Sequence, residues 1–347
     1  MYIFVNITKK YQIIHIMIKK IVILIVVISI FSCTEVSKRE IIHYEGFAFG
    51  STFSIKYIDD KSIKYEKSVD SIIHAINKSL STYIPTSDIS KINKGDSTVI
   101  VDELFKEIFL KSKKINLETN GVFDPTIGIL VNAWGFGPEK PIENLDSVKV
   151  KELLKFVGFE KVILNTDAQI IKKYPEIYLD FNSIAPGFAA DIIGRFFESK
   201  NITNYMIEIG GEIKARGKNQ HNEFWKIAIE NPNEDGSRSF ATTILLNNES
   251  IATSGNYRKF KIDEKGQKFA HIINTKTGYS SKTDLLSVSV ISPIDCAEVD
   301  AYATAFMAMG YQNTLQFLKN RNDIKVFLIY ANPDGTIGTY STVQFEK

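Results

Sequence analysis

Apolar residues recur every three or four positions in several segments of the chain, which is the spacing of one face of an amphipathic helix. Val69, Ile73 and Ile76 illustrate this spacing. Asp102 has the kind of side chain that caps a helix N-terminus, and it directly precedes the next such segment. The pattern predicts helices over residues 66–80, 102–118, 147–157, 188–199, 296–309 and 311–320.

Short runs of β-branched and aromatic residues lie mostly in the second half of the chain and predict strands. Turn-forming pairs such as Gly210-Gly211, Asn247-Asn248 and Asp334-Gly335 separate them. Because strands mostly follow strands without strict alternation with helices, the predicted fold class is α+β. Residues 44–347 contain no segment of linker composition, so we expect one folded unit. Strands are predicted over residues 46–58, 205–209, 223–230, 241–247, 285–292 and 325–331.

The N-terminus has the pattern of a secretory signal. Lys19-Lys20 precede the apolar run 21–31, which is shorter than the roughly 20 residues of a membrane-spanning helix. Ile30-Phe31-Ser32-Cys33 resembles a bacterial lipobox, in which the cysteine becomes the lipidated first residue. We therefore expect a lipoprotein signal peptide over 1–32, a lipid on Cys33 and a polar tether over 33–43. A start at Met17 would make residues 1–16 a start-site extension. The alternatives for Cys33 are an unmodified cysteine in a cleaved leader and an uncleaved anchor.

Composition and charge narrow the functional class. The 347 residues are 44% hydrophobic and 24% charged, which is ordinary for a globular protein. Two cysteines exclude a disulfide framework and a Cys-x-x-Cys zinc or redox motif. Four lysines and no acidic residue lie in 1–32, so the net charge of +2 belongs to the leader and the rest is slightly acidic. That balance argues against a general nucleic-acid-binding protein, which needs a basic surface.

Asp300 and Thr304 are four residues apart in the predicted helix 296–309, so they share one face of it. A carboxylate beside a hydroxyl offers hard oxygen ligands suited to Mg²⁺ bound together with a phosphate. The alternative is a solvated aspartate, with a threonine that hydrogen-bonds back to a carbonyl of its own helix.

Two other residues and one segment are chemical candidates. Asp124 precedes Pro125, so its side chain either contacts a ligand or closes an Asx turn. Residues 179–191 run from a strand end into a helix whose N-terminus would attract phosphate. The ordinary pKa of histidine lies near neutrality, so His271 is a candidate general base, and a structural hydrogen-bonded histidine is its alternative. The residues alone predict an exported α+β protein with an Mg²⁺–phosphate site.

Six segments, in this order, resemble the ApbE family of FAD:protein FMN transferases. The clearest are Gly121-Val-Phe-Asp-Pro-Thr-Ile-Gly128, with its continuation to Gly137, and His271-Ile-Ile-Asn-Thr-Lys-Thr-Gly278. The resemblance extends over most of 44–347, and the ordered set is more specific than any one motif. The other matching segments are residues 80–90, 207–213, 252–258 and 296–310.

This resemblance implies a fold and a reaction. The fold would be a single T-fold-related α+β unit with mixed or antiparallel sheets, flanking helices and a central FAD cleft. The enzyme would split FAD with Mg²⁺, transfer FMN through its phosphate to a Ser or Thr of a target protein, and release AMP. Asp300 and His271 would be the catalytic residues, and Ser183, Asp300 and Thr304 the metal ligands. The FAD site would be lined by Phe49, Tyr83, Val122, Phe123, Asp124, Asp180, Pro186 and Ile272.

The resemblance also implies a location and partners. The chain would be anchored by its lipid with the folded unit on the periplasmic or extracytoplasmic side of a membrane. Its acceptor would be an exported subunit of an electron-transfer or ion-pumping complex, and no nucleic acid would bind. Pro186 and Asn274 depart from the residues common in the family, so a charged contact at 186 is expected to be absent, and local capping or a charged contact at 274 to be weaker. The alternative functions are an Mg²⁺-dependent FAD pyrophosphatase and a non-catalytic FAD-binding lipoprotein.

Overall fold

The computed structural model places the folded part of the chain in one unit. Contacts divide the chain into two units, Met1–Arg39 and Glu40–Lys347. No helix among the described residues combines the length and the apolar character that a membrane span requires. The part of the chain that the structure describes leaves out the apolar run 21–31 of the predicted signal peptide, Cys33 and the tether up to residue 39. The structure describes residues 15, 17, 19, 40–233, 237, 239–255, 260–262 and 268–342.

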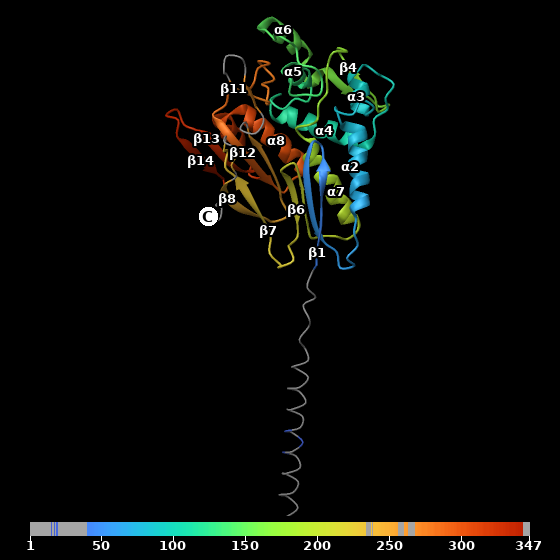
Figure 1. The fold of residues 1–347 in the computed structure, drawn as a ribbon, viewed down its shortest axis with the longest axis vertical. Coiled ribbons are helices and arrows are strands. Elements are labelled where there is room, and N and C mark those ends of the chain that lie inside the picture. The colour runs from blue at the N-terminus through green and yellow to red at the C-terminus, as the bar shows by residue number, and fades with distance from the viewer. Residues whose placement is uncertain are drawn as a thin grey trace, which may run out of the picture. The chain divides into compact units, whose positions relative to one another are not determined.

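An eight-stranded sheet in the order β1-β2-β5-β6-β9-β12-β13-β14 forms the centre of the second unit (Figure 1). Every neighbouring pair is antiparallel. Side chains alternate between its two faces, so Val288 and Val290 of β12 pack toward the helices while Ile291 packs on the other side. The strands are β1 (Ile41–Ala48), β2 (Ser51–Ile58), β5 (Tyr205–Ile209), β6 (Glu212–Arg216), β9 (Ser250–Gly255), β12 (Leu285–Ser292), β13 (Lys325–Ala331) and β14 (Ile337–Ser341).

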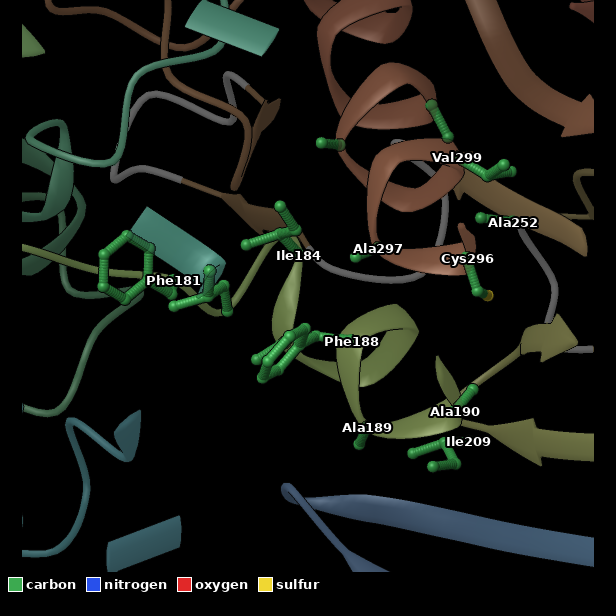
Figure 2. Packing of buried hydrophobic residues seen from close by; sticks show 14 of the residues in the cluster. Phe181, Ile184, Phe188, Ala189, Ala190, Ile209, Ala252, Cys296, Ala297 and Val299 are labelled. Atoms are coloured by element: carbon green, nitrogen blue, oxygen red, sulfur yellow. The ribbon is translucent and has the colours of Figure 1, made fainter. Parts of the chain in front are cut away.

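Helices cover one face of this sheet in two layers. Helices α7 (Ala185–Ser199) and α8 (Cys296–Met309) contact the strands, and α2 (Glu66–Leu80) and α4 (Glu103–Glu118) pack against α7 and α8. Figure 2 shows Phe188, Ala189 and Ala190 of α7 below the first turn of α8. Phe188 is fully buried, and it belongs to the main hydrophobic cluster between helices and sheet.

The opposite face of the sheet is covered by the hairpin of β7 (Trp225–Glu230) and β8 (Phe240–Leu246). Trp225 and Leu246 pack there against Ile251 and Phe327 of the sheet. The hydrophobic faces of sheet and hairpin therefore form a second core.

A third, smaller cluster stabilises the upper part of the unit in Figure 1. Leu130, Val150, Val157 and Ile273 are its buried members. It joins α5 (Gly128–Ala133) and α6 (Ser147–Leu153) to the segment that follows β11. The remaining elements are α3 (Asp88–Asn93), α9 (Tyr311–Leu318), two 3₁₀ turns (Leu154–Phe156 and Phe159–Lys161), β3 (Val162–Leu164), β4 (Ile170–Lys172), β10 (Phe260–Ile262) and β11 (Lys268–Ala270).

The observed elements confirm the α+β class and most of the predicted helices. The single strand predicted over 46–58 is wrong, because the chain turns at Phe49 and Gly50 and forms the hairpin β1–β2. Both turn residues have positive φ, 54° and 75°. Strand β1 begins at Ile41, ahead of the predicted boundary at residue 44, because Ile41 and Ile42 pair with the end of β2.

Candidate active site

Helices α7 and α8 approach most closely at Gly187. A Cβ atom on Gly187 would lie 2.5 Å from the carbonyl oxygen of Cys296 and 3.0 Å from the Cα of Ala297. Pro186 stands in the first turn of α7, where its missing N–H removes no helical hydrogen bond. Glycine at 187 therefore lets the first turn of α7 lie directly against α8.

We expect Gly187→Ala to destabilise the protein. The added methyl group meets backbone atoms, which cannot move aside as a flexible side chain can, and overpacking of this kind costs about 1–3 kcal/mol. Denaturant unfolding would measure the change. Gly194→Ala on the same helix is the control, because its Cβ would meet only side-chain atoms of Tyr205 and Lys214. Equal stability of the two variants would contradict this account of the helix contact.

Asp300 lies on α8 opposite this first turn of α7 and is buried, with 6% of its surface exposed. Among the described residues the one hydrogen bond that its carboxylate accepts comes from the Gly187 N–H, at 3.3 Å. Burial raises the pKa of this carboxyl well above its usual value. A buried carboxylate with so little compensation is unusual, because such groups are normally paired or bound to a metal.

Thr304 and Ser183 are the other two predicted oxygen ligands. Thr304 lies one turn after Asp300, and its hydroxyl is 3.3 Å from that of Ser254 on β9. Ser183 is half-buried and stands just before α7, on the chain that leads to Gly187. One carboxylate and two hydroxyls fit Mg²⁺, which keeps the rest of its shell for water and substrate oxygens. The described residues contain no cluster of three or more acidic, histidine or cysteine side chains that could hold a metal ion, so two of the three proposed ligands are hydroxyls.

A second group of the predicted residues gathers around Asp180, directly upstream of Ser183. Asp180 is buried, and burial raises its pKa, while the Asn182 N–H donates to its carboxylate at 2.8 Å. Asn182 also donates to the Thr82 hydroxyl at 3.3 Å. The neighbouring Tyr83 has 59% of its surface exposed, and burial of its remainder and the charge of Asp180 raise its pKa. An exposed aromatic ring is thus held beside a buried carboxylate, close to the start of α7.

Asp124 closes a turn. One of its carboxylate oxygens accepts from the N–H and the hydroxyl of Thr126, at 2.8 and 2.6 Å, and the other accepts from the N–H of Phe159 at 2.9 Å. Its backbone neighbour Pro125 accepts from the N–H of Asp180 at 2.9 Å. The structure thus places Asp124 next to the Asp180 group, with its carboxylate occupied by protein donors.

His271 and Ile272 lie on a loop that is tied to the Gly121 segment. The Thr275 hydroxyl donates to the Gly121 carbonyl at 2.7 Å, and the Trp134 indole donates to the Gly278 carbonyl at 2.8 Å. His271 is half-buried, and its ring centre lies 6.4 Å from that of Phe136. Val122, Phe123 and the His271 loop are therefore brought to one region, although about 150 residues separate them.

Some sequence predictions are not joined to this arrangement. Phe49 is half-buried at the β1–β2 turn, and no hydrogen bond or aromatic contact within the described residues links it to the other candidates. The motif residues 256–258 lie outside the described part of the chain. Sequence reasoning singled out the segments that contain Gly187 and Ser254 but gave neither residue a role, because their contacts with α8 are not visible in a local pattern.

Two cavities flank rather than contain these residues. One of about 240 Å³ adjoins the segment just before Asp180 and is lined by residues such as Asn93, Glu139 and Tyr178. A larger one of about 600 Å³ lies where β6 ends and β9 begins, at the opposite ends of these strands from Glu212 and Ser254. We locate the candidate site from its side chains, because a buried carboxylate with one weak hydrogen bond indicates chemistry more directly than cavity size.

The antiparallel α+β fold places the helix N-terminus at Gly187 against the buried carboxylate of Asp300, and helix N-termini commonly bind phosphate groups. The model of the ApbE family matches residues 49–328 of this chain. The chain therefore belongs to the ApbE family.

Relatives and solved structures agree with this assignment. The chain is 35% identical over 332 residues to the FAD:protein FMN transferase of Haemophilus influenzae, which covers 92% of this chain and 94% of the relative. It is 34% identical over 307 residues to the FAD:protein FMN transferase of Vibrio cholerae, and this match covers 85% of this chain and 89% of the relative. The flavin transferase ApbE structure from Vibrio cholerae superposes with a TM-score of 0.77 at 31% identity, covering 87% of this chain and 97% of that one. The apo structure of the flavinyl transferase ApbE of Pseudomonas stutzeri superposes with a TM-score of 0.78 at 26% identity, covering 89% of this chain and 96% of that one.

Proposed function

We propose that this chain is an FAD:protein FMN transferase. The proposal is supported by its relatives of that name, which match nearly its whole length. The observation that carries it is Asp300, a buried carboxylate with one weak hydrogen bond beside the first turn of α7. That arrangement suits a reaction in which a pyrophosphate must be held and its charge offset.

The oxygen ligands of the metal would be Asp300, Thr304 and Ser183. Bound Mg²⁺ would offset the charge that develops on the pyrophosphate oxygens as the bond breaks. The chain itself contributes the N-terminus of α7, where backbone N–H groups favour an anion. Asp300 fits this role because no cation among the described residues pairs with its carboxylate and the Gly187 N–H is its one hydrogen-bond donor there, while burial and the charge of Asp191 raise its pKa.

Transfer requires a proton to leave the acceptor hydroxyl, and we assign its removal to His271. The acceptor oxygen forms a bond to the FMN phosphorus, the bond from this phosphorus to the bridging oxygen breaks, and AMP leaves with that oxygen. The histidine takes the acceptor's proton. Tyr83 offers an exposed aromatic face on which a flavin or adenine ring can stack, next to Asp180.

We further propose that the acceptor and the enzyme meet outside the cytoplasm. The lipobox-like sequence that ends in Cys33 predicts a lipid anchor, and the short polar segment after it would keep the folded unit near the membrane surface. The acceptor would then be an exported protein with an accessible Ser or Thr, such as a subunit of an electron-transfer or ion-pumping complex.

The deciding experiment incubates the full chain, purified in mild detergent, with FAD, Mg²⁺ and a candidate acceptor domain. We expect the acceptor to gain the mass of one FMN, AMP to form in equal amount, and both to disappear with EDTA. AMP and free FMN with an unmodified acceptor would instead indicate hydrolysis, and tight FAD binding without AMP would indicate a binding protein. The intact mass of the purified chain tests the anchor, since it should correspond to a chain that begins at Cys33 and carries lipid.

A further inference from the structure

The N-terminus of α8 is capped by a side chain from another helix. The residue before α8, Asp295, makes no capping hydrogen bond with its own side chain. Instead Asp191 of α7 accepts from the N–H of Cys296 with one carboxylate oxygen and from the N–H of Ala297 with the other, both at 2.9 Å. Two of the N–H groups that every helix leaves unpaired at its start are thus satisfied from 105 and 106 residues away.

Asp191 is buried and is held by one cation. Its side chain is 1% exposed, and Lys214 of β6 donates to it at 2.6 Å. Lys214 also lies 3.5 Å from Asp295, which in turn binds Lys111 of α4 at 2.5 Å. Losing Asp191 would therefore leave Lys214 in partial contact with Asp295, and would leave both N–H groups of α8 without a partner.

The Asp191 cap and the candidate metal site both lie at the contact between α7 and α8. Asp191 lies one helical turn after Gly187, and Asp300 lies one turn after Cys296. Helix α7 therefore contacts α8 at two successive points, through Gly187 beside Asp300 and through Asp191 at Cys296 and Ala297. These contacts fix both the position and the rotation of the first turns of α8. Because Ser183 leads into α7 and Asp300 belongs to α8, the relation of the two helices sets the separation of two metal ligands.

We propose that Asp191 is a positioning residue of the metal site. It touches neither substrate nor metal, and it holds the ligand Asp300 at its place relative to Ser183 by capping α8. The inference rests on the proposed function only in its assignment of the metal ligands. Its consequence is that a change at Asp191 weakens metal binding although every ligand is still present.

The test measures binding of Mn²⁺ alone to the full chain in detergent, with the electron paramagnetic resonance signal of free Mn²⁺ as the readout. Thermal unfolding of the metal-free proteins is measured alongside. The variants are Asp191→Asn, the double variant Asp191→Asn with Lys214→Met, and Asp300→Asn. Glu249→Gln is the matched control, because Glu249 is another buried carboxylate bound to a lysine, Lys325, and contacts neither α7 nor α8 by hydrogen bond.

We expect Asp191→Asn to weaken Mn²⁺ binding at least about fivefold and to lower the unfolding temperature. The double variant removes the uncompensated Lys214 charge, so the unfolding temperature should recover in part, while Mn²⁺ binding stays weak because the NH₂ group introduced by Asp191→Asn still faces an N–H of α8. Asp300→Asn should abolish specific binding, and Glu249→Gln should bind as the wild type does.

Three results would overturn the inference. Wild-type Mn²⁺ affinity in Asp191→Asn, with binding lost in Asp300→Asn, would refute the positioning role and leave the proposed metal site intact. Affinity that recovers together with the unfolding temperature in the double variant would show that only the buried charge mattered. Wild-type protein that binds no Mn²⁺, or that binds it independently of Asp300, would refute both the metal site and the role of Asp191.

Discussion

Replacing Asp300 with alanine is expected to abolish Mg²⁺-dependent release of AMP from FAD while the fold survives. The carboxylate is the one charged group among the proposed metal ligands, and removing a group that stabilises transition-state charge typically lowers kcat by about 10²–10³-fold. We expect a loss at the upper end of this range or beyond it. The fold should persist because the substitution removes one 3.3 Å hydrogen bond and an otherwise uncompensated buried carboxylate.

The measurement combines AMP release with thermal unfolding in the presence and absence of Mg²⁺. Ligand binding to the folded state raises its stability, so Mg²⁺ with FAD should raise the unfolding temperature of the wild type and not that of Asp300→Ala. Glu298→Gln is the control, since Glu298 lies on the same helix, is also buried and is bound to Lys114 instead. An Asp300→Ala protein with full activity would refute the metal assignment.

The sequence predicted elements best where one local pattern decided the structure. Helix α2 and helix α8 have the predicted limits, as do β5, β12 and β13. Strands β6 and β9 were not predicted, because they are only five and six residues long and the buried residues of β9 are confined to its first half. They are strands because β5 and β12 offer them partners, and that information is not local.

In the candidate site, too, the features set by a local pattern were predicted and those set by distant residues were not. The spacing of Asp300 and Thr304 on one helix face was predictable, whereas the close approach of Gly187 and the cap from Asp191 depend on residues more than 100 positions away. At Asn274 the side-chain oxygen accepts from the N–H groups of Lys276 and Thr277 at 2.9 and 3.0 Å, so a local cap is present there. That this cap is weaker than one made by the family's usual residue stays a prediction.

Asp124 was predicted from the family resemblance as an FAD-site residue, and the local pattern offered an Asx turn instead. The described part of the chain contains three turns of the pattern Asp-x-Thr, at Asp96, Asp124 and Asp334, in which the threonine N–H and hydroxyl both donate to one carboxylate oxygen. The hydrogen bonds from threonine lower the pKa of Asp96 and of Asp334. Burial raises the pKa of Asp124 despite the same bonds. The three turns share a geometry and differ in their environment.

Asp124→Ala is therefore expected to be strongly destabilising. It leaves the Thr126 and Phe159 N–H groups buried without their acceptor, and each such donor costs about 1–3 kcal/mol, so the free energy of unfolding should fall by about 2–6 kcal/mol. The unfolding temperature should drop by roughly 5–15 °C. Asp96→Ala, at the exposed turn of the same pattern, is the control and should unfold close to the wild-type temperature.

A further substitution at this position distinguishes a turn from a direct FAD contact. Asp124→Asn keeps an oxygen that can accept from Thr126, but its NH₂ group faces the N–H of Phe159, so it should lose part of the stability. If Asp124 acts only through its turn, the Asn and Ala variants should lose FAD affinity in proportion to their loss of stability. An Asn variant that unfolds at the wild-type temperature yet binds FAD many times more weakly would show that the carboxylate contacts the flavin nucleotide directly. In that case the two donors that now occupy it would have to release it when FAD binds.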